Sequence, residues 1–201
     1  MRRILPVVEG QGDMGAVPEL IRRIALSHGY NDVHVLSPHR RGDLPKVLSR
    51  FDDFVRTALF EKCPVLWVLD YDCEHCLDHK RDAVDLRRRA ENLAEGARVE
   101  FVFMVQEFET LFLSDHETTR AVFADIKNTL AFPKDPEAIR DAKGWLSEAR
   151  PKGSAYKATQ HQTKLTSRLD LARLRMRSGS YVRFEAAVRA LIECQTAEQT
   201  P

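Results

Sequence analysis

Short, uninterrupted hydrophobic runs alternate with longer amphipathic stretches along the first half of the chain. The runs cover residues 4–8, 33–36, 65–69 and 99–105, and the amphipathic stretches cover residues 17–28, 44–60 and 77–95. A run such as Val65–Leu69 is typical of a strand buried on both faces, whereas apolar positions three and four residues apart indicate a helix. The alternation predicts an α/β fold, in which a small parallel sheet of about four strands with right-handed crossovers is flanked by helices.

The second half of the chain carries only helical patterns. Helices are expected at residues 117–126, 136–149, 163–176 and 181–194, with proline and glycine residues between them. Because no further strand is predicted, we interpret residues 1–115 as an α/β core and residues 116–195 as a helical part packed on the same domain. The last residues, 195–201, have too few apolar side chains to dock and are expected to fray.

The composition indicates a globular protein of one domain. The 201 residues are 43% hydrophobic and 30% charged, and the net charge of +1 gives no reason by itself to expect a nucleic-acid partner. The first apolar run is too short for a secretory signal, and no stretch approaches the roughly 20 apolar residues of a membrane span. Four cysteines are too few for a disulfide framework in a chain of this length. We therefore expect a cytoplasmic protein without a membrane partner.

Acidic residues follow three of the four predicted strands. They are Glu9 after the first strand, Asp70 and Asp72 after the third, and Glu107 and Glu109 after the fourth. Ligands of parallel α/β sheets bind at the carboxyl ends of the strands, so these side chains are expected to converge. Asp70 and Asp72 are two residues apart on extended backbone and are expected to point to the same side.

Converging carboxylates favour a bound cation, because like charges raise one another's pKa. Hard oxygen ligands suit Mg²⁺ or Mn²⁺, and a pair of such ions can activate the attacking oxygen and stabilise the leaving oxygen in phosphoryl transfer. Gly10 and Gly12 would let the backbone approach a phosphate closely.

Structural interpretations of the same acids stay open. An acid after a strand, such as Asp72, is often a helix N-cap, and Glu107 or Glu109 can be a first-turn acid favoured by the helix dipole. If the segment of the two glutamates is helical, they face different directions and only one of them is a direct ligand.

Residues 150–183 contain nine basic side chains and one acidic side chain, Asp170. A cationic helix face of this kind can bind phosphates, and Lys157 and Lys164 are the expected contacts. The alternative is a solvated helix surface that pairs with the acidic middle of the chain. Tyr156 and Tyr181 are candidates for stacking on bases, or else core residues.

Cysteine and histidine residues cluster directly after Asp72. Cys73, Cys76 and His79 could supply three zinc ligands, but the chain has no second Cys/His pair of the kind that structural zinc sites use. A redox disulfide between the two cysteines is a second interpretation. The third is that they are small, half-buried residues at the start of a helix.

Two segments resemble a known family. Glu9-Gly10, followed by Asp70-Tyr71-Asp72 at the end of a later buried strand, resembles the Glu and Asp-x-Asp motifs of TOPRIM domains. Phe101–Asp115, which reads FVFMVQEFETLFLSD, is similar to the Gln-x-x-Glu-Phe-Glu-Ala-Leu-Leu-Phe-Ser-Asp block of a TOPRIM-like family of unknown function. Looser similarity extends to Tyr156 and to Lys164-Leu165. That family is often encoded beside an AAA or ABC-type ATPase and is related to the nuclease half of OLD-type proteins.

The resemblance implies a TOPRIM-like, Rossmann-like fold and metal-dependent phosphodiester hydrolysis of nucleic acid, with DNA as the expected substrate. In this interpretation Glu9, Asp70 and Asp72 are catalytic. Glu9 is a metal-linked acid that also serves proton transfer, Asp70 and Asp72 are ligands of Mg²⁺ or Mn²⁺, and Glu107 or Glu109 is an added acid at the same metal site. An ATPase partner in phage defence or DNA repair is implied as well, and the chain has no Walker A sequence of its own.

Other functions are compatible with parts of the pattern. A non-catalytic TOPRIM-fold module would keep the fold and bind a partner protein or nucleic acid. An Asp-nucleophile phosphatase also uses Asp-x-Asp after a strand, but that motif normally opens the domain and is followed by Thr or Val. Here Asp72 comes after the third strand and is followed by Cys73. We therefore take the metal-dependent nuclease as the hypothesis and the binding module as its alternative.

Overall fold

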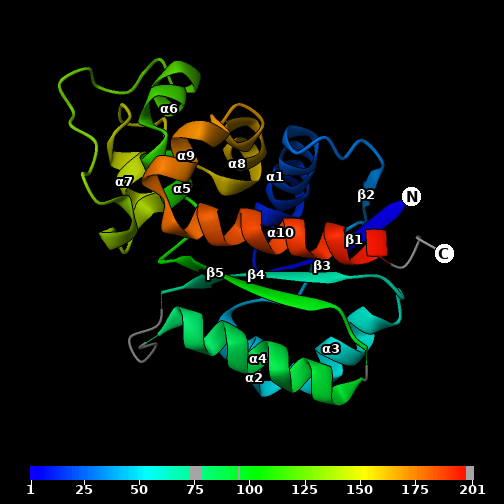
Figure 1. Ribbon diagram of the computed structural model, residues 1–201. Helices are drawn as coiled ribbons and strands as arrows, with labels where there is room; N and C mark the ends of the chain where they lie inside the picture. The colour runs from blue at the N-terminus through cyan, green and yellow to red at the C-terminus, as the bar shows by residue number, and fades with distance from the viewer. Residues whose placement is uncertain (73–77, 95, 198–201) are drawn as a thin grey trace.

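A five-stranded parallel sheet forms the centre of the structure, with strand order β2-β1-β4-β5 and with β3 paired to β1 (Figure 1). The computed structural model describes residues 1–72, 78–94 and 96–197. The strands are β1 (Arg2–Val8), β2 (Val33–Val35), β3 (His39–Arg40), β4 (Val65–Tyr71) and β5 (Val99–Val105). The predicted α/β class, with a small parallel sheet flanked by helices, is confirmed.

Helices cover both faces of the sheet (Figure 1). One face packs on α1 (Asp13–Ser27) and α10 (Gly179–Ala197), and the other packs on α2 (Leu44–Ser49), α3 (Phe51–Leu59) and α4 (His79–Leu93). Side chains of a strand alternate between the two faces, so the uninterrupted apolar run of β4 supplies both cores. Its residue Val68 belongs to the first core and Trp67 to the second, where Trp67 stacks on Phe101 of β5 with the ring centroids 5.3 Å apart.

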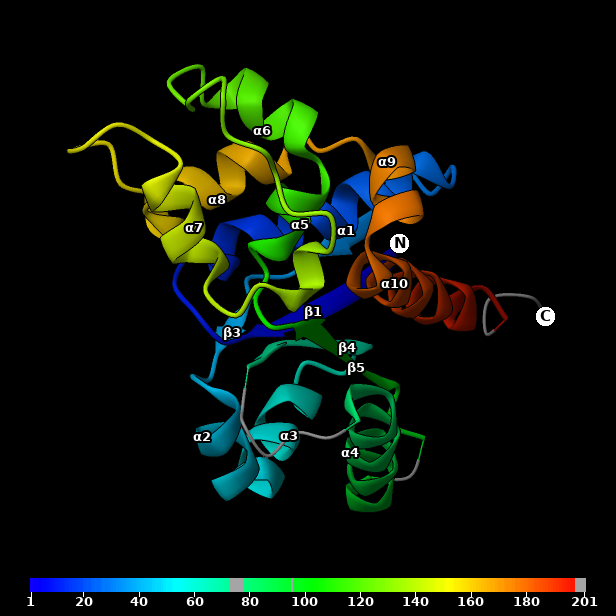
Figure 2. The same ribbon diagram turned by 90° about the vertical axis from the view of Figure 1, so that its left-hand side faces the viewer.

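The remaining helices gather beyond the carboxyl ends of the strands (Figure 2). They are α5 (Thr110–Ser114), α6 (His116–Val122), α7 (Ala142–Glu148), α8 (Ala158–Thr166), α9 (Leu171–Arg177) and a short 3₁₀ helix, η1 (Pro136–Ala138). Helix α8 packs on α1, and α10 returns from this layer across the sheet. In the described part of the chain, no helix is both long and apolar enough to cross a membrane.

Several predicted helices are divided in the structure. The predicted helix 44–60 is two helices that meet at Arg50, and the predicted helix 163–176 is α8 followed by α9. The side chain of Asp170 caps α9 by accepting hydrogen bonds from the backbone N–H groups of Ala172 and Arg173. Asp141 likewise caps α7 through the Gly144 backbone N–H, so the predicted helix 136–149 is divided into η1 and α7. Caps of this kind define helix starts that hydrophobic periodicity alone does not show.

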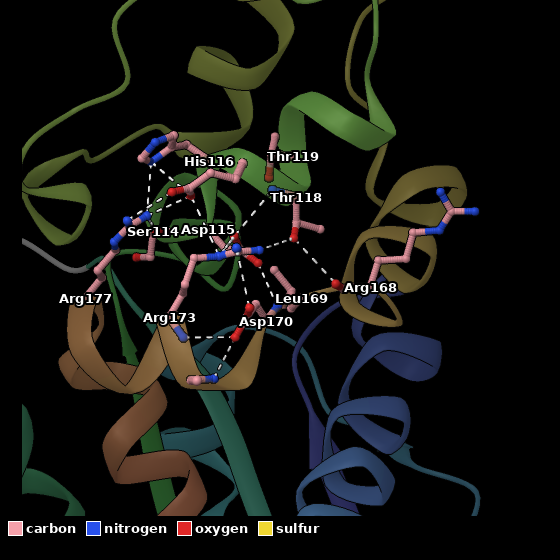
Figure 3. A network of polar contacts seen from close by, with 12 residues as sticks. Ser114, Asp115, His116, Thr118, Thr119, Arg168, Leu169, Asp170, Arg173 and Arg177 are labelled. Carbon is pink, nitrogen blue, oxygen red and sulfur yellow. Dashed lines mark hydrogen bonds and ion pairs between the residues drawn. The ribbon is translucent and has the colours of Figure 1, made fainter.

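A buried aspartate connects the helices of this layer (Figure 3). Asp115 is fully buried and accepts hydrogen bonds from the Arg173 guanidinium at 2.7 Å, the Asp170 backbone N–H at 2.7 Å and the Thr118 backbone N–H at 3.3 Å. It therefore caps α6 and holds the start of α9 against it. A buried carboxylate requires such partners, because without them its desolvation is not compensated.

We expect Asp115→Ala to lower the free energy of unfolding by about 3 kcal/mol, because the substitution removes the shared acceptor of a buried network. Asp115→Asn keeps an acceptor but loses the charge, so its loss should be intermediate. Urea denaturation measures both values. Asp85→Ala, at an exposed carboxylate of α4, is the control and should cost less than about 0.5 kcal/mol. A cost for Asp115→Ala as small as that of the control would contradict the role of the network.

Candidate functional site

Two of the predicted acids meet at the carboxyl ends of β1 and β4. These strands are neighbours in the sheet, and Val8 is in register with Val68. Glu9, just after β1, therefore lies beside the end of β4, where Asp70 is the second-last residue. The Glu9 carboxylate accepts a hydrogen bond from the Asp70 backbone N–H at 3.3 Å. The Asp70 carboxylate accepts one from the Phe108 backbone N–H at 2.9 Å, which connects the site to the turn after β5.

The turn after β5 directs both of its glutamates to one point. Gln106 has a φ of +62° and bridges back to Tyr71, and the helix begins only at Thr110. Because the segment of Glu107 and Glu109 is a turn, the condition for their facing different directions, a helical segment, is not met. Carboxylate oxygens of both residues lie close to the same ammonium group, at 3.1 Å and 3.5 Å.

That ammonium group belongs to Lys143 of α7. Its Nζ also lies 3.5 Å from an oxygen of Asp70. Glu107 accepts a hydrogen bond from the Lys143 backbone N–H at 3.1 Å as well, so one glutamate positions both the start of α7 and the ammonium group. Sequence reasoning did not find Lys143, because nothing in the local pattern of α7 distinguishes it from a surface lysine.

A cavity of about 170 Å³ lies between these acids and helix α8. Its lining consists of Glu9, Gly10, Gln11, Gly12, Asp13, Asp70, Glu109, Lys143, Ala158, Thr159 and Gln162. Asp13 is a carboxylate that the predicted ligand set did not include. It accepts hydrogen bonds from the Gly10 backbone N–H at 2.7 Å and from the Gln162 amide at 2.6 Å. Its position four residues after Glu9, at the start of α1, is the sequence signal that could have found it.

Burial raises the pKa of several of these carboxyl groups. It raises the pKa of Glu9 to about 7, helped by the charges of Asp13 and Asp72, and it raises that of Glu109 to about 7. Burial also raises the pKa of Asp70, and the ammonium of Lys143 offsets only part of this effect. The ionised forms of these acids are therefore not fully stabilised by their surroundings, and a bound cation would favour ionisation.

The neighbouring acids raise the pKa of Lys143. Burial alone would lower it, but Glu109, Asp70 and Glu107 outweigh burial and raise it above its usual range. Tyr156 is buried beside them and donates a hydrogen bond to Glu109 at 3.1 Å. Burial and the charge of Glu109 raise the pKa of Tyr156, so its hydroxyl stays protonated. It is not available for stacking on a base.

The donor set fits a hard divalent ion, since it consists of carboxylate oxygens. One oxygen of Glu109, Oε2, is buried and has no hydrogen-bond partner among the described residues, although it faces the Lys143 ammonium. Within residues 1–72, 78–94 and 96–197, however, no group of three or more Asp, Glu, His or Cys residues is already arranged to hold a metal ion. In this structure the Lys143 ammonium lies where the carboxylates converge.

The other predicted site residues lie around this cavity or away from it. Asp72 is exposed after β4 and does not line the cavity, but its charge acts on Glu9. Gly12 lies against Ala158 and Gln162, so any side chain there would collide with α8. Its role in phosphate binding stays a prediction.

Gly10, like Gly12, lines the cavity, and its approach to a phosphate stays a prediction, whereas the predicted lysine contacts and zinc ligands do not line the cavity or lie outside the described residues. Lys157 and Lys164 are exposed and do not line the cavity, so their contact with phosphate also stays a prediction. Cys73 and Cys76 lie outside the described residues. His79, at the start of α4, packs edge-on against Tyr71.

Most arginines of the basic stretch are already paired. Arg150 binds Asp125 at 2.9 Å, Arg173 binds Asp115, Arg175 binds Glu185 and Arg177 binds Glu117, the last at 2.8 Å. The interpretation of this stretch as a helix surface paired with acidic residues therefore describes these four side chains, two of which appear in Figure 3. Tyr181 is fully buried, so it is a core residue and not a stacking platform.

Comparison with known proteins places the chain in a family. The family model of DUF4276, a domain of unknown function, matches residues 8–189, and the chain belongs to this family. Two solved structures of the C-terminal region of the Xanthomonas campestris pv. campestris OLD protein, phased with iodine and with platinum, are similar at 14% identity. They give TM-scores of 0.45 and 0.44, over 98% of this chain and 98% and 95% of those chains. No curated protein sequence matches the chain significantly.

Glu9→Gln is expected to gain stability relative to the wild type as the pH rises from about 5 to about 8 in metal-free protein. The pKa of Glu9 is about 7 in the folded state against an ordinary value of 4.5, so the folded wild type binds more protons in this window. Its stability is therefore full at low pH and is lost as the pH rises through the folded pKa, whereas glutamine has no proton to lose.

Urea denaturation in EDTA at several pH values measures this difference. Asp85→Asn, on the exposed face of α4, serves as the control for the loss of one carboxyl group. A constant difference between Glu9→Gln and the wild type would mean that Glu9 titrates in the folded protein as it does in the unfolded chain.

Proposed function

We propose that this member of the DUF4276 family is a metal-dependent nuclease of the TOPRIM type, which hydrolyses phosphodiester bonds of nucleic acid and most readily DNA. The observation that carries the proposal is the convergence of Glu9, Asp70 and Glu109 on one small cavity at the carboxyl end of a parallel sheet, with the pKa of each raised by burial. The Glu-Gly and Asp-x-Asp motifs that resemble TOPRIM domains supply the first two of these acids.

Glu9, Asp70 and Asp72 would hold Mg²⁺ or Mn²⁺, with Glu109 as an added acid. Such an ion supplies charge stabilisation and an activated nucleophile in phosphodiester hydrolysis. Of the two glutamates after β5, Glu109 is the better candidate, because it lines the cavity and Glu107 does not. The carboxylate of Glu107 is instead engaged with the backbone and ammonium groups of Lys143.

Two side chains would assist the reaction beyond metal binding. Glu9, with a pKa of about 7, can accept or hold a proton at its carboxylate near neutral pH, as a general base requires. The Lys143 ammonium, at 3.5 Å from Asp70, can stabilise negative charge that develops in the cavity. Ala158 and Gln162 of α8 line the other side of the cavity, and burial of the site strengthens both electrostatic effects.

The proposed cellular role rests on the resemblance to the TOPRIM-like family that is often encoded beside an AAA or ABC-type ATPase. We infer a cytoplasmic nuclease that acts with such an ATPase in phage defence or DNA repair. The absence of a Walker A sequence from the chain is consistent with a nucleotide-hydrolysing function located on a separate partner.

A second candidate function has an observation in its favour. Lys143 lies among Asp70, Glu107 and Glu109. The positive charge of a lysine in this position can compensate the acids in place of a metal ion. A non-catalytic module would keep this arrangement permanently and use the fold to bind a partner protein or nucleic acid. The two functions differ in whether the cavity accepts a divalent ion.

Cleavage of supercoiled plasmid and of single-stranded DNA and RNA should require Mg²⁺ or Mn²⁺ and should stop in EDTA. Glu9→Gln and Asp70→Asn are each expected to lower the rate at least about 100-fold, because they remove a proton acceptor and a metal ligand. Asp85→Asn is the matched control, at an exposed aspartate of α4, and should cut at the wild-type rate.

Calorimetric titration with Mn²⁺ separates the two candidate functions. A nuclease should bind Mn²⁺, and Asp70→Asn should abolish the binding. Folded wild-type protein that neither binds Mn²⁺ nor cuts any of the substrates would refute the nuclease and leave the binding module in its place.

A further inference from the structure

A group of basic side chains lies around β3, at an edge of the sheet, and β3 pairs with the strand that ends just before Glu9. Strand β3 pairs with the end of β1, with Arg40 in register with Val8, the residue before Glu9. The backbone N–H of Arg41 donates a hydrogen bond to the Val8 carbonyl at 2.9 Å. Since neighbouring strands are about 4.8 Å apart, the basic residues of β3 begin one strand spacing from the backbone of Glu9. Figure 2 shows the chain running from this point to α2.

The turn after β3 gathers further positive charge. Gly42 has a φ of +88°, and the Lys46 side chain folds over it, with its Cδ 2.9 Å and its Nζ 3.5 Å from where a Cβ would lie. The guanidinium groups of Arg41 and Arg50 each lie 5.1 Å from the centre of the Phe54 ring. We call Arg40, Arg41, Lys46 and Arg50 the β3 basic patch.

The charges of the β3 basic patch are poorly compensated. Among the described residues, only Arg50 has a carboxylate partner, Asp53, at 3.5 Å between two exposed side chains. The carboxylate of Asp43 is engaged in capping α2 through the Lys46 backbone N–H. The Nε of Arg41 is buried without a hydrogen-bond partner in the part of the chain that the structure describes. Burial and the charge of Arg50 lower the pKa of Arg41, as expected for cations held together.

The positive charge of the β3 basic patch is not neutralised by the acids of the cavity among the described residues. Within the described residues, no member of the β3 basic patch forms an ion pair with Glu9, Asp13 or Asp70, although Lys143 does pair with the acids. This contrasts with Arg150, Arg173 and Arg177 of the basic stretch, whose partners are internal carboxylates. The β3 basic patch is thus positive charge that remains available to an external anion.

We propose that the β3 basic patch binds the phosphate backbone of nucleic acid and so holds the strand beside the acidic cavity. This inference rests on the proposed function, because it places the patch next to the phosphodiester that the cavity would cleave. Three of its four members, Arg40, Lys46 and Arg50, are exposed, and Arg41 is half-buried and supports them. Lysine and arginine contacts of this kind release counterions and make binding fall with salt.

Binding of a fluorescein-labelled DNA duplex in EDTA, followed by fluorescence anisotropy over a range of KCl concentrations, tests the inference without requiring cleavage. The triple variant Arg40→Ala, Lys46→Ala, Arg50→Ala should bind at least about 10-fold more weakly, with a salt slope lower by about 2 to 3. An RNA duplex of the same sequence forms a second arm, and the same losses should appear there if phosphates alone are contacted.

The matched control removes the same net charge elsewhere, at the exposed arginines Arg22, Arg88 and Arg189, each changed to Ala. It should change the affinity less than about 2-fold. Equal losses in the two triple variants would refute a local contact, and so would a wild type that binds neither duplex in a salt-dependent way. Circular dichroism confirms that each variant is folded, and the single variant Arg40→Gln should reproduce part of the loss.

The outcome is separable from that of the nuclease test. If the plasmid is not cut but the β3 triple variant still loses duplex binding, the patch stands and the nuclease fails. If the plasmid is cut and the triple variant binds and cuts like the wild type, the patch fails and the nuclease stands.

Discussion

The ammonium group of Lys143 lies among Asp70, Glu107 and Glu109, and this contact joins helix α7 of the helical layer to the ends of β4 and β5. Carboxylates from the end of β4 and from the turn after β5 are brought within a few ångströms of each other, which like charges oppose unless a cation is present. Helix α7 supplies that cation, and Glu107 binds the backbone at the start of the helix as well. A helix from the second half of the chain is thereby fixed over the ends of two strands from the first half.

The single ammonium group of Lys143 compensates the negative charge of the site only in part. One ammonium faces several buried carboxyl groups, and the pKa values of Glu9 and Glu109 remain near 7. A divalent ion would compensate this charge better than a lysine does, since it adds a second positive charge and takes several oxygen ligands. The raised pKa values and the lysine are therefore two consequences of one arrangement, in which the fold holds acids together at an energetic cost. Shifted pKa values of buried acids in a cavity mark a candidate functional site.

Basic side chains on the two sides of this site have different surroundings. Arginines of the basic stretch are used internally, as in the network of Asp115 and Arg173 that joins α6 to α9 (Figure 3). At the edge of the sheet, Arg40 and Arg41 have no carboxylate partner among the described residues. The net charge of the whole chain is close to zero, so it does not indicate an anion-binding site. The position of each basic residue shows whether it pairs with a carboxylate of the chain or can bind an external anion.

Much of the fold could be predicted from periodicity. The apolar runs predicted β1, β4 and β5 closely, because a strand buried on both faces leaves an unmistakable pattern. Strand β3 has two residues and α5 has five, too short for periodicity to register, and the division of the predicted helix 163–176 depends on a capping aspartate, Asp170. Helix boundaries of this kind are decided by local hydrogen bonds that hydropathy does not report.

The acids that follow the strands could be predicted from sequence alone, because parallel strands end at one edge of the sheet and Glu9 and Asp70 lie at the ends of two of them. Three relations required the folded chain: Glu107 and Glu109 both face Lys143, Glu109 rather than Glu107 lines the cavity, and Asp13 lines it as well. The physical reason is that these relations depend on a turn conformation at Gln106 and on helices α7 and α8, which pack across the sheet end from more than thirty residues away in the chain. Local sequence patterns report which face of an element is buried, and they carry no information about which distant side chain will supply the opposite charge.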